Sequence, residues 1–451
     1  MKKNLYILME IASRELDANL ILALFSLKKN FNVILGDSST YSYLLKKNLL
    51  IPGIVLTKSV THGEAKSKLH SLFKSNGFKL TAIDHEHGVL DSLNYKKYFI
   101  KSRIEKKELI KFDAFFCWGN YDYKHLRESL PTYKKKFFLT GSNRVDAWKN
   151  AEKENFINEK DKKNIAIFSN FALSNNKYGK KKYFNLKKKA GYYLRCPELL
   201  AKDKLFLKYQ IENIKKFISM VNYLPDRFPN YNFLFKPHPV ENKSFWYKKL
   251  VKKNNLKIVE PENSTRLIKF CDLVIQTRCT TSVECVINSI NHINYVPLSA
   301  KHGFGNFVDK FSNNAKNEEQ VEMLIESLLK SKKIEYKKKN ILNSRVLFKN
   351  IEPASKRIAL ILKQLSNKIE NKKLQNIFKI KISLFVFEIY NQLKRSIYNV
   401  IFSYKNLNEY KFPNFSKKII ENKIQKLAIN YKFKITFKIT KIGNRFWLIE
   451  N

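Results

Sequence analysis

Two histidines and two carboxylates crowd the end of one apolar run in the sequence. The run KLTAI is followed directly by Asp84, His85, Glu86, His87 and Gly88. Carboxylates and imidazoles in one loop can supply a general base near neutral pH, and they are also possible zinc ligands. A polar turn with a glycine hinge is the plainer interpretation, but so many titratable groups at one strand end favour a functional loop. The candidate bases are Asp84, Glu86 and His87.

A second candidate lies where the apolar run NFLF ends in Lys-Pro-His-Pro. Lys236 can offer a point charge to a phosphate, and His238 can offer a hydrogen-bond donor. Pro237 and Pro239 restrict the backbone around the histidine, so such a site would be ordered in advance. The alternative is a stiff corner whose histidine bonds only to nearby backbone.

A third candidate follows the run DLVIQ, where Thr280, Thr281 and Ser282 open a predicted helix. Backbone N–H groups at a helix start, with hydroxyls beside them, bind anions. Glu284 in the first turn can accept from ribose hydroxyls, or it can simply complement the helix dipole. Together with Lys236 and His238, these residues predict phosphate binding in the second half of the chain.

The first apolar run, NLYILM, also ends in charged residues, among them Arg14 and Glu15. Acidic residues in the first turn of a helix commonly complement its dipole. The functional alternative is an acceptor-binding lip, with Arg14 and Glu15 as its candidate contacts.

The elements that would hold these residues alternate between short apolar runs and helical patterns. This alternation predicts an α/β protein with parallel, doubly wound sheets, in which ligands bind at the carboxyl ends of the strands. A stretch rich in Lys and Asn at 150–163 is the best linker, and the alternation restarts after it. We expect two Rossmann-like domains facing each other across a cleft, an acceptor domain at 1–150 and a nucleotide-sugar domain at 160–340.

The pattern changes in residues 341–451, which we expect to form a basic, amphipathic and mainly helical extension. Residues 373–405 mix apolar and basic residues at helical spacing. This spacing indicates either a helix lying on an anionic membrane or a helix that packs back on the protein core. The last run, 431–450, alternates like a small strand pair and has no predicted role.

Composition narrows the classes of partner. Lys and Arg number 86 against 39 Asp and Glu, for a net charge of +47. This charge fits an anionic partner, although a solvated surface and an AT-rich genome would also produce many lysines. The 5 cysteines include no CxxC pair and suit a reducing compartment. With no apolar run of about 20 residues, we expect a cytoplasmic protein that can lie on the inner face of the membrane.

A series of motifs runs in a fixed order through roughly residues 1–310: SRELDANLILAL, VILGD, PGIVLTKS, DHEHG, DAFFCWG, TGSNRVDAW, KPHP and TTSVE. This ordered series resembles the bacterial surface carbohydrate biosynthesis proteins, which are similar to GT-B glycosyltransferases of capsule and lipopolysaccharide assembly. Within GT-B enzymes, the trio of acidic loop, HP pair and Ser/Thr pair is similar to bacterial sialyltransferases and Kdo transferases.

That resemblance implies a donor and a set of roles. Both enzyme groups use CMP-activated 2-keto-3-deoxy acid sugars and need no metal or further cofactor. By match, His238, Thr281 and Ser282 would hold the CMP phosphate, and Glu86 would deprotonate a glycan or glycolipid acceptor. The relatives place an acid directly before the glycine, where this chain has His87, so Asp84 and His87 remain alternative bases.

Two other functions fit the same sequence. Wall teichoic acid polymerases share the GT-B fold, an HP motif and a basic surface, so transfer of glycerol phosphate from CDP-glycerol is an alternative. A non-catalytic protein that binds an anionic membrane or nucleic acid would also explain the charge. The chain has no recognisable RNA- or DNA-binding motif, so we do not expect a nucleic-acid partner.

Overall fold

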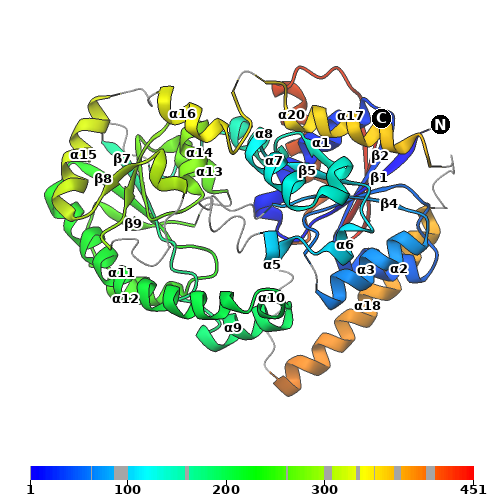
Figure 1. Cartoon of the computed structure of the whole chain (residues 1–451), viewed down its shortest axis with the longest axis horizontal. Coiled ribbons are helices and arrows are strands. Elements are labelled where there is room, and N and C mark those ends of the chain that lie inside the picture. The colour runs from blue at the N-terminus through cyan, green and yellow to red at the C-terminus, as the bar shows by residue number, and fades with distance from the viewer. Residues whose placement is uncertain are drawn as a thin grey trace. The chain divides into compact units, whose positions relative to one another are not determined.

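In the computed structural model, the protein forms two compact units. The described residues are 2–61, 63–85, 100–157, 162–260, 263–298, 307–331, 336–349, 351–369, 377–402 and 412–451. Unit 1 lies within 1–86, 105–150 and 350–451, and unit 2 within 87–104 and 151–349. Figure 1 shows that each unit is built around one sheet with helices against it.

Unit 1 contains an 8-stranded sheet in the order β13-β14-β2-β1-β3-β4-β5-β6. Strands β1 to β6 are parallel to one another, and β14 pairs antiparallel with β2 and with β13. The strands are β1 (Lys3–Leu8), β2 (Phe31–Gly36), β3 (Ile54–Thr57), β4 (Lys79–Ile83), β5 (Ala114–Cys117), β6 (Phe137–Leu139), β13 (Lys438–Gly443) and β14 (Phe446–Glu450). The order of its parallel strands, 2-1-3-4-5-6, places the switch point of a doubly wound sheet between β1 and β3.

The helices of unit 1 come from both ends of the chain. They are α1 (Ala12–Leu27), α2 (Ser38–Lys46), α3 (Glu64–Ser75), α6 (Lys106–Leu109), α7 (Asn120–Ser129), α8 (Asn143–Asn150), α17 (Ala354–Ser366), α18 (Ile377–Phe402) and α20 (Lys417–Asn430), with a 3-10 turn at Pro131–Lys136. Helix α1 is buried along most of its length because it contacts β2, α8, α17 and α20.

Unit 2 contains a 6-stranded parallel sheet in the order β12-β11-β10-β7-β8-β9. The strands are β7 (Lys163–Phe168), β8 (Tyr231–Lys236), β9 (Leu256–Ile258), β10 (Leu273–Gln276), β11 (Asn291–Tyr295) and β12 (Asn313–Ala315). Counted along this unit, the order is 3-2-1-4-5-6, so the switch point lies between β7 and β10. The predicted fold, two Rossmann-like doubly wound domains, is therefore confirmed.

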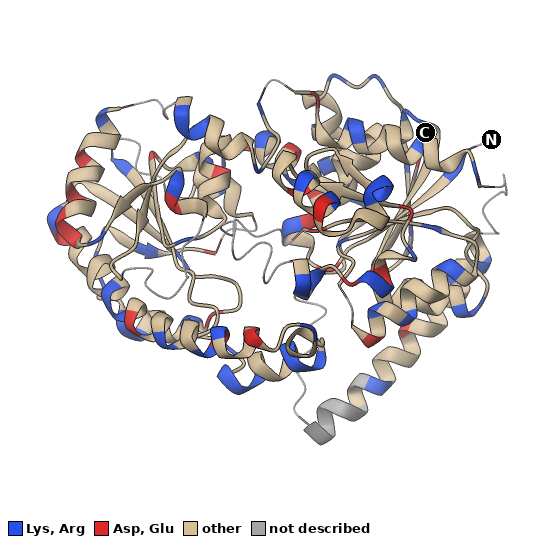
Figure 2. Ribbon diagram, in the orientation of Figure 1, with Lys and Arg blue, Asp and Glu red and all other residues tan. Residues whose placement is uncertain are grey.

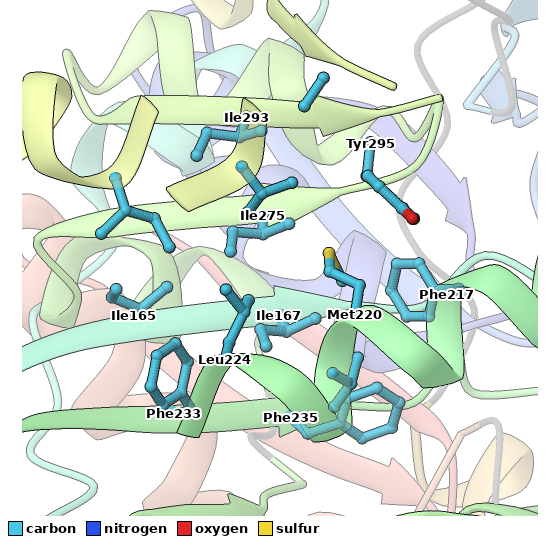
Figure 3. Close-up of a cluster of buried hydrophobic side chains, with 14 of the residues drawn as sticks. Ile165, Ile167, Phe217, Met220, Leu224, Phe233, Phe235, Ile275, Ile293 and Tyr295 are labelled. Carbon is cyan, nitrogen blue, oxygen red and sulfur yellow. The ribbon is translucent and has the colours of Figure 1, made fainter. Parts of the chain in front are cut away.

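Helices and apolar side chains complete unit 2. The helices are α5 (Lys101–Arg103), α9 (Lys180–Lys189), α10 (Tyr192–Arg195), α11 (Glu198–Arg227), α12 (Lys243–Lys249), α13 (Ser264–Phe270), α14 (Thr281–Ile287), α15 (Glu318–Lys330) and α16 (Tyr336–Asn343), with a 3-10 turn at Phe307–Lys310. In Figure 3, Phe217 and Met220 of α11 lie against Ile167 and Ile275 of the sheet. This alternation of strands and amphipathic helices is what the sequence predicted.

The domain limits differ from the prediction in two places. Residues 341–451 were expected to form an extension of their own, but 341–349 group with unit 2 and the described residues from 351 onward group with unit 1. The physical reason is that β14 continues the sheet beside β2, where backbone groups of an edge strand would otherwise lack partners. In addition, residues 100–104 fall in unit 2, where Arg103 donates to the Tyr192 hydroxyl at 3.1 Å.

A buried carboxylate attaches the late helix α17 to the early part of unit 1. Asp146 is 4% exposed and accepts from the backbone N–H of Ala354 at 3.0 Å and of Ser355 at 2.7 Å, and from the Ser355 hydroxyl at 2.7 Å. Burial raises the pKa of this carboxyl, and the hydrogen bonds oppose that rise. Pro353, the N-cap of α17, has no side-chain cap of its own, so Asp146 performs that role from a distant part of the sequence.

Asp146→Ala should destabilise unit 1 by about 3 kcal/mol, because it leaves buried donors without an acceptor. The matched control is Asn317→Ala, which removes the local cap of α15 on Gln320 N–H and should cost about 1 kcal/mol. Urea unfolding of both variants measures the difference. Equal losses would show that Asp146 is no more than an ordinary cap.

Candidate functional site

In unit 2 the ends of β7, β8 and β10 meet at the switch point of the sheet. Asn170, just after β7, donates to the carbonyl oxygens of Thr277 at 3.2 Å and Arg278 at 3.3 Å, just after β10. Lys236 is the last residue of β8 and is paired in register with Phe168 of β7. Ligands of open α/β sheets bind at such a point. The predicted Lys-Pro-His-Pro and Thr-Thr-Ser segments therefore both follow strands at this edge.

Glu241 holds the Lys-Pro-His-Pro loop in place. It is 1% exposed, and its carboxylate accepts from the Ser169 hydroxyl at 2.6 Å, the Phe171 N–H at 2.5 Å and the Trp246 indole N–H at 2.7 Å. The Ser169 oxygen in turn accepts from the His238 N–H at 3.1 Å. The loop after β8 is thus connected to the loop after β7 through one buried carboxylate.

The two loop residues predicted to bind phosphate differ in exposure. Lys236 is 8% exposed, with its ammonium 5.6 Å from the centre of the Phe168 ring. His238 is half-buried, and its Nδ1 accepts a long hydrogen bond of 3.4 Å from the Val240 N–H. Because Nδ1 is the acceptor, this contact favours the tautomer with the proton on Nε2. A histidine in that form can donate to a phosphate oxygen.

The turn between β10 and α14 is fixed by a polar network that the sequence did not reveal. Arg278 has a left-handed backbone, with φ of 44°, and its guanidinium bonds to Asp309 at 3.1 Å and to the Tyr209 hydroxyl at 2.7 Å. The backbone N–H of Arg278 donates to Asn294 Oδ1 at 2.8 Å. The Gln276 side chain accepts from the Cys279 N–H at 2.6 Å. These bonds hold Thr280 and the start of α14 in one position.

The predicted anion site at the start of α14 has fewer free donors than expected. The N–H groups of Ser282 and Val283 already bond to carbonyl oxygens of the turn, at 3.2 Å and 2.9 Å. The hydroxyls remain candidates: Thr280 is exposed, and Thr281 Oγ1 lies 3.2 Å from Cys279 Sγ. Ser282 Oγ is buried and has no hydrogen-bond partner in the described part of the chain. Phosphate binding here remains a prediction that depends on these hydroxyls.

Glu284 points toward another helix start rather than lying open to solvent. It is 6% exposed, and its carboxylate accepts from the Thr265 hydroxyl at 2.6 Å. Thr265 is the second residue of α13. The contact ties α13 to α14, so the predicted bond from Glu284 to a ribose hydroxyl would have to share this carboxylate.

In unit 1 the predicted pair Arg14 and Glu15 is divided between solvent and interior. Arg14 is exposed, whereas Glu15 is 2% exposed and accepts from the Glu10 N–H at 2.8 Å. Lys58, just after β3, lies 2.5 Å from Glu10 and 3.8 Å from Glu15. Burial raises the pKa of Glu15, and Lys58 opposes the rise. Glu15 thus orders the loop between β1 and α1.

A small pocket that is partly open to solvent lies at the switch point of unit 1. Its lining includes Glu10 from the end of β1, Lys58 after β3, and His70 from α3. His70 Nδ1 lies 2.8 Å from Glu108, and both side chains are buried. Burial lowers the pKa of His70. Burial alone would raise the pKa of Glu108. Its hydrogen bonds, of which the one with His70 has the largest effect, instead lower this pKa to about 2.

The acidic loop is described only at its start. Asp84 follows β4, is 2% exposed, and its carbonyl oxygen accepts from the Trp118 indole at 2.9 Å. The carbonyl oxygen of His85 accepts from Arg144 at 2.6 Å. Glu86 and His87, the other candidate bases, lie outside the described residues. Within the described ranges, no group of three or more His, Cys, Asp or Glu side chains is arranged to hold a metal ion, and independence from metal remains a prediction.

Sequence reasoning missed Ser169, Glu241, Lys58 and His70. Glu241 carried a detectable signal, since it follows the His-Pro pair closely and a single acid beside a proline corner needs a partner. The other three are ordinary residues whose position depends on contacts between distant strands and helices. Nothing in their local sequence distinguishes them.

The fold can be compared with known proteins. No family model and no curated protein matches the sequence. Among solved structures, a UDP-N-acetylglucosamine 2-epimerase described as putative, from Listeria monocytogenes, matches with a TM-score of 0.53 and 12% identity over 82% of this chain and 98% of that one. The UDP-GlcNAc 2-epimerase of Methanocaldococcus jannaschii matches with a TM-score of 0.51 and 14% identity over 80% and 99%.

These similarities establish an architecture. At such low identity they show the fold alone, and that fold agrees with the two Rossmann-like units described above. The chain therefore has the GT-B fold. Its candidate sites lie at the switch point of each unit, where doubly wound sheets bind ligands.

Glu241→Ala should disorder the Lys-Pro-His-Pro loop and destabilise the protein by about 3 kcal/mol, because three buried donors lose their acceptor. Glu260→Ala is the control, since Glu260 is an exposed acid of the same unit, paired with Lys243, and should cost under about 1 kcal/mol. Urea unfolding measures both. A loss of stability no larger in Glu241→Ala than in the control would contradict the role given to this carboxylate.

The raised pKa of Glu241 also predicts that the free energy of unfolding depends on pH. Burial raises its pKa from 4.5 to about 6, so between these values the folded state binds a proton that the unfolded state has lost. Its contribution to stability is therefore full below pH 4.5 and falls as pH rises through 6, by about 2 kcal/mol. Glu241→Gln cannot titrate. The difference between the unfolding free energies of the two proteins should change over this pH window, and a constant difference would argue against the raised pKa.

Proposed function

We propose that the protein is a glycosyltransferase of surface polysaccharide synthesis. It transfers a CMP-activated 2-keto-3-deoxy acid sugar to a glycan or glycolipid acceptor, in the cytoplasm and at the inner face of the membrane. The observation that carries this proposal is the position of Lys236 and His238 at the switch point of unit 2, held there by buried Glu241. A cation and an imidazole donor fixed at such an edge suit the phosphate of a nucleotide.

The proposed reaction assigns each group a task. The acceptor hydroxyl attacks the anomeric carbon of the donor, and the bond from that carbon to the phosphate oxygen of CMP breaks. The proton of the hydroxyl passes to a base in the acidic loop, Glu86 by resemblance, with Asp84 and His87 as alternatives. Lys236 and the His238 Nε2–H stabilise the charge that develops on the departing phosphate, assisted by the hydroxyls of Thr280, Thr281 and Ser282.

The pocket of unit 1 supports the placement of the acceptor in that unit. It lies at the switch point between β1 and β3 and combines a cation, Lys58, with an imidazole, His70. Pockets at this position in open α/β sheets are ligand sites. Glu15 acts there indirectly, because its carboxylate orders the backbone of Glu10.

Lys236→Ala and His238→Ala should each weaken nucleotide binding by about tenfold or more, because each removes a charged or polar partner of the phosphate. Lys257→Ala, which removes an exposed lysine from β9, should leave affinity unchanged. Isothermal titration with CMP, CDP and UDP measures the effect and shows which base the site prefers. Equal affinity in all three variants would overturn the site assignment.

The donor is identified by a second assay. Purified protein is incubated with a CMP-activated sugar, CDP-glycerol or UDP-GlcNAc, each with and without acceptor glycan, and nucleotide release is followed. Acceptor-dependent release of CMP from the CMP-sugar supports the proposal. Release from CDP-glycerol alone would make the protein a glycerophosphotransferase. Conversion of UDP-GlcNAc to its C2 epimer without acceptor and without net release of UDP, followed by NMR, would make it an epimerase.

A further inference from the structure

Helix α18 has two apolar faces, and only one of them is covered by unit 1. On the inner face, Ile380 and Leu384 are each 1% exposed. The Phe387 ring stacks on Tyr43 of α2 with centroids 4.2 Å apart, and the Tyr43 hydroxyl bonds to Ser383. The helix therefore packs on the protein core, which is one of the two arrangements that its sequence allowed.

The opposite face of α18 is exposed and rich in large apolar side chains. They recur at helical spacing along one side, and each is between 40% and 67% exposed: Phe378, Ile382, Phe385, Val386, Ile389, Tyr390 and Leu393. No other described helix has more than two exposed residues of this kind. Single exposed apolar residues are normal, but a contiguous patch marks an interaction surface.

The charges beside this patch indicate what covers it. Lys379, Lys381 and Lys394 are exposed on the same helix. Its acidic residue, Glu388, accepts from the Asn444 N–H at 2.7 Å and so belongs to the packed side. Lys and Arg also predominate over the rest of the molecule, as Figure 2 shows, in agreement with the net charge of +47. An apolar stripe flanked by lysines suits the boundary between lipid headgroups and acyl chains.

The geometry points to the outer face of α18 as the surface by which this protein docks on an anionic lipid bilayer. Its apolar side chains enter the headgroup boundary, and the flanking lysines contact anionic headgroups. The helix lies on the bilayer, since no described helix is both long and apolar enough to cross it. Docking rests on the proposed function only in that a glycolipid acceptor would be found at such a surface.

The test is sedimentation of the full chain with vesicles of phosphatidylcholine, with or without phosphatidylglycerol. The wild type should bind the anionic vesicles, and the triple variant Phe385→Gln, Ile389→Gln, Leu393→Gln should bind at least about tenfold more weakly. The matched control replaces three exposed apolar residues of unit 2, Leu194→Gln, Tyr247→Gln and Met323→Gln, and should bind like the wild type. Thermal unfolding should be the same in all three, because every changed side chain is exposed.

Two further variants separate the contributions. Lys379→Gln, Lys381→Gln, Lys394→Gln should weaken binding to anionic vesicles and reduce its dependence on salt. His238→Ala should leave vesicle binding intact even where it abolishes nucleotide binding, so a failure of one proposal is not a failure of the other. Failure of the wild-type protein to bind anionic vesicles would overturn the inference. So would vesicle binding that the α18 variant retains, or a patch whose loss instead dissociates a dimer in sedimentation velocity.

Discussion

The candidate site of unit 2 depends on one buried carboxylate. Glu241 accepts hydrogen bonds from Ser169, Phe171 and Trp246 in a setting where burial raises its pKa. A carboxylate in such a position costs free energy unless its oxygens are satisfied. Its partners come from the loop after β7 and from α12, and Glu241 itself lies in the loop after β8, so satisfying it requires these three segments to occupy one arrangement. The direction in which His238 is presented follows from that requirement.

The same device recurs in unit 1. Glu15 binds the backbone of Glu10 in the loop after β1, and Asp146 binds the first N–H groups of α17. Burial raises the pKa of both carboxyls. In each case an acid uses backbone donors to fix a chain segment that regular secondary structure does not hold. Parallel sheets need such contacts, because their functional loops all leave from one edge and have few backbone partners of their own.

How much of this could be predicted depends on the range of the contacts. The alternating pattern predicted both parallel sheets, and it also predicted that Lys236, His238 and Asp84 would lie at or just after the ends of strands. The two antiparallel strands near the carboxyl terminus were recognised as a pair, but their place beside β2 was not. That pairing joins residues about 400 positions apart, such as Trp447 and Leu35, and no local pattern encodes it. Lys58 escaped prediction for the same reason, since its role arises from contacts with the loop after a neighbouring strand.

The high positive charge has two different explanations in different parts of the chain. Helix α9 has three lysines at each end and no buried residue. Lys187 among them pairs with Asp203 at 2.7 Å, but a solvated surface accounts for most of this charge. The lysines of α18 differ because they flank exposed apolar side chains on a helix whose other side is anchored to α2. A helix that only completed the core would not need large apolar residues on both sides. The distribution of apolar side chains, rather than the net charge, therefore distinguishes a surface that binds from one that is merely solvated.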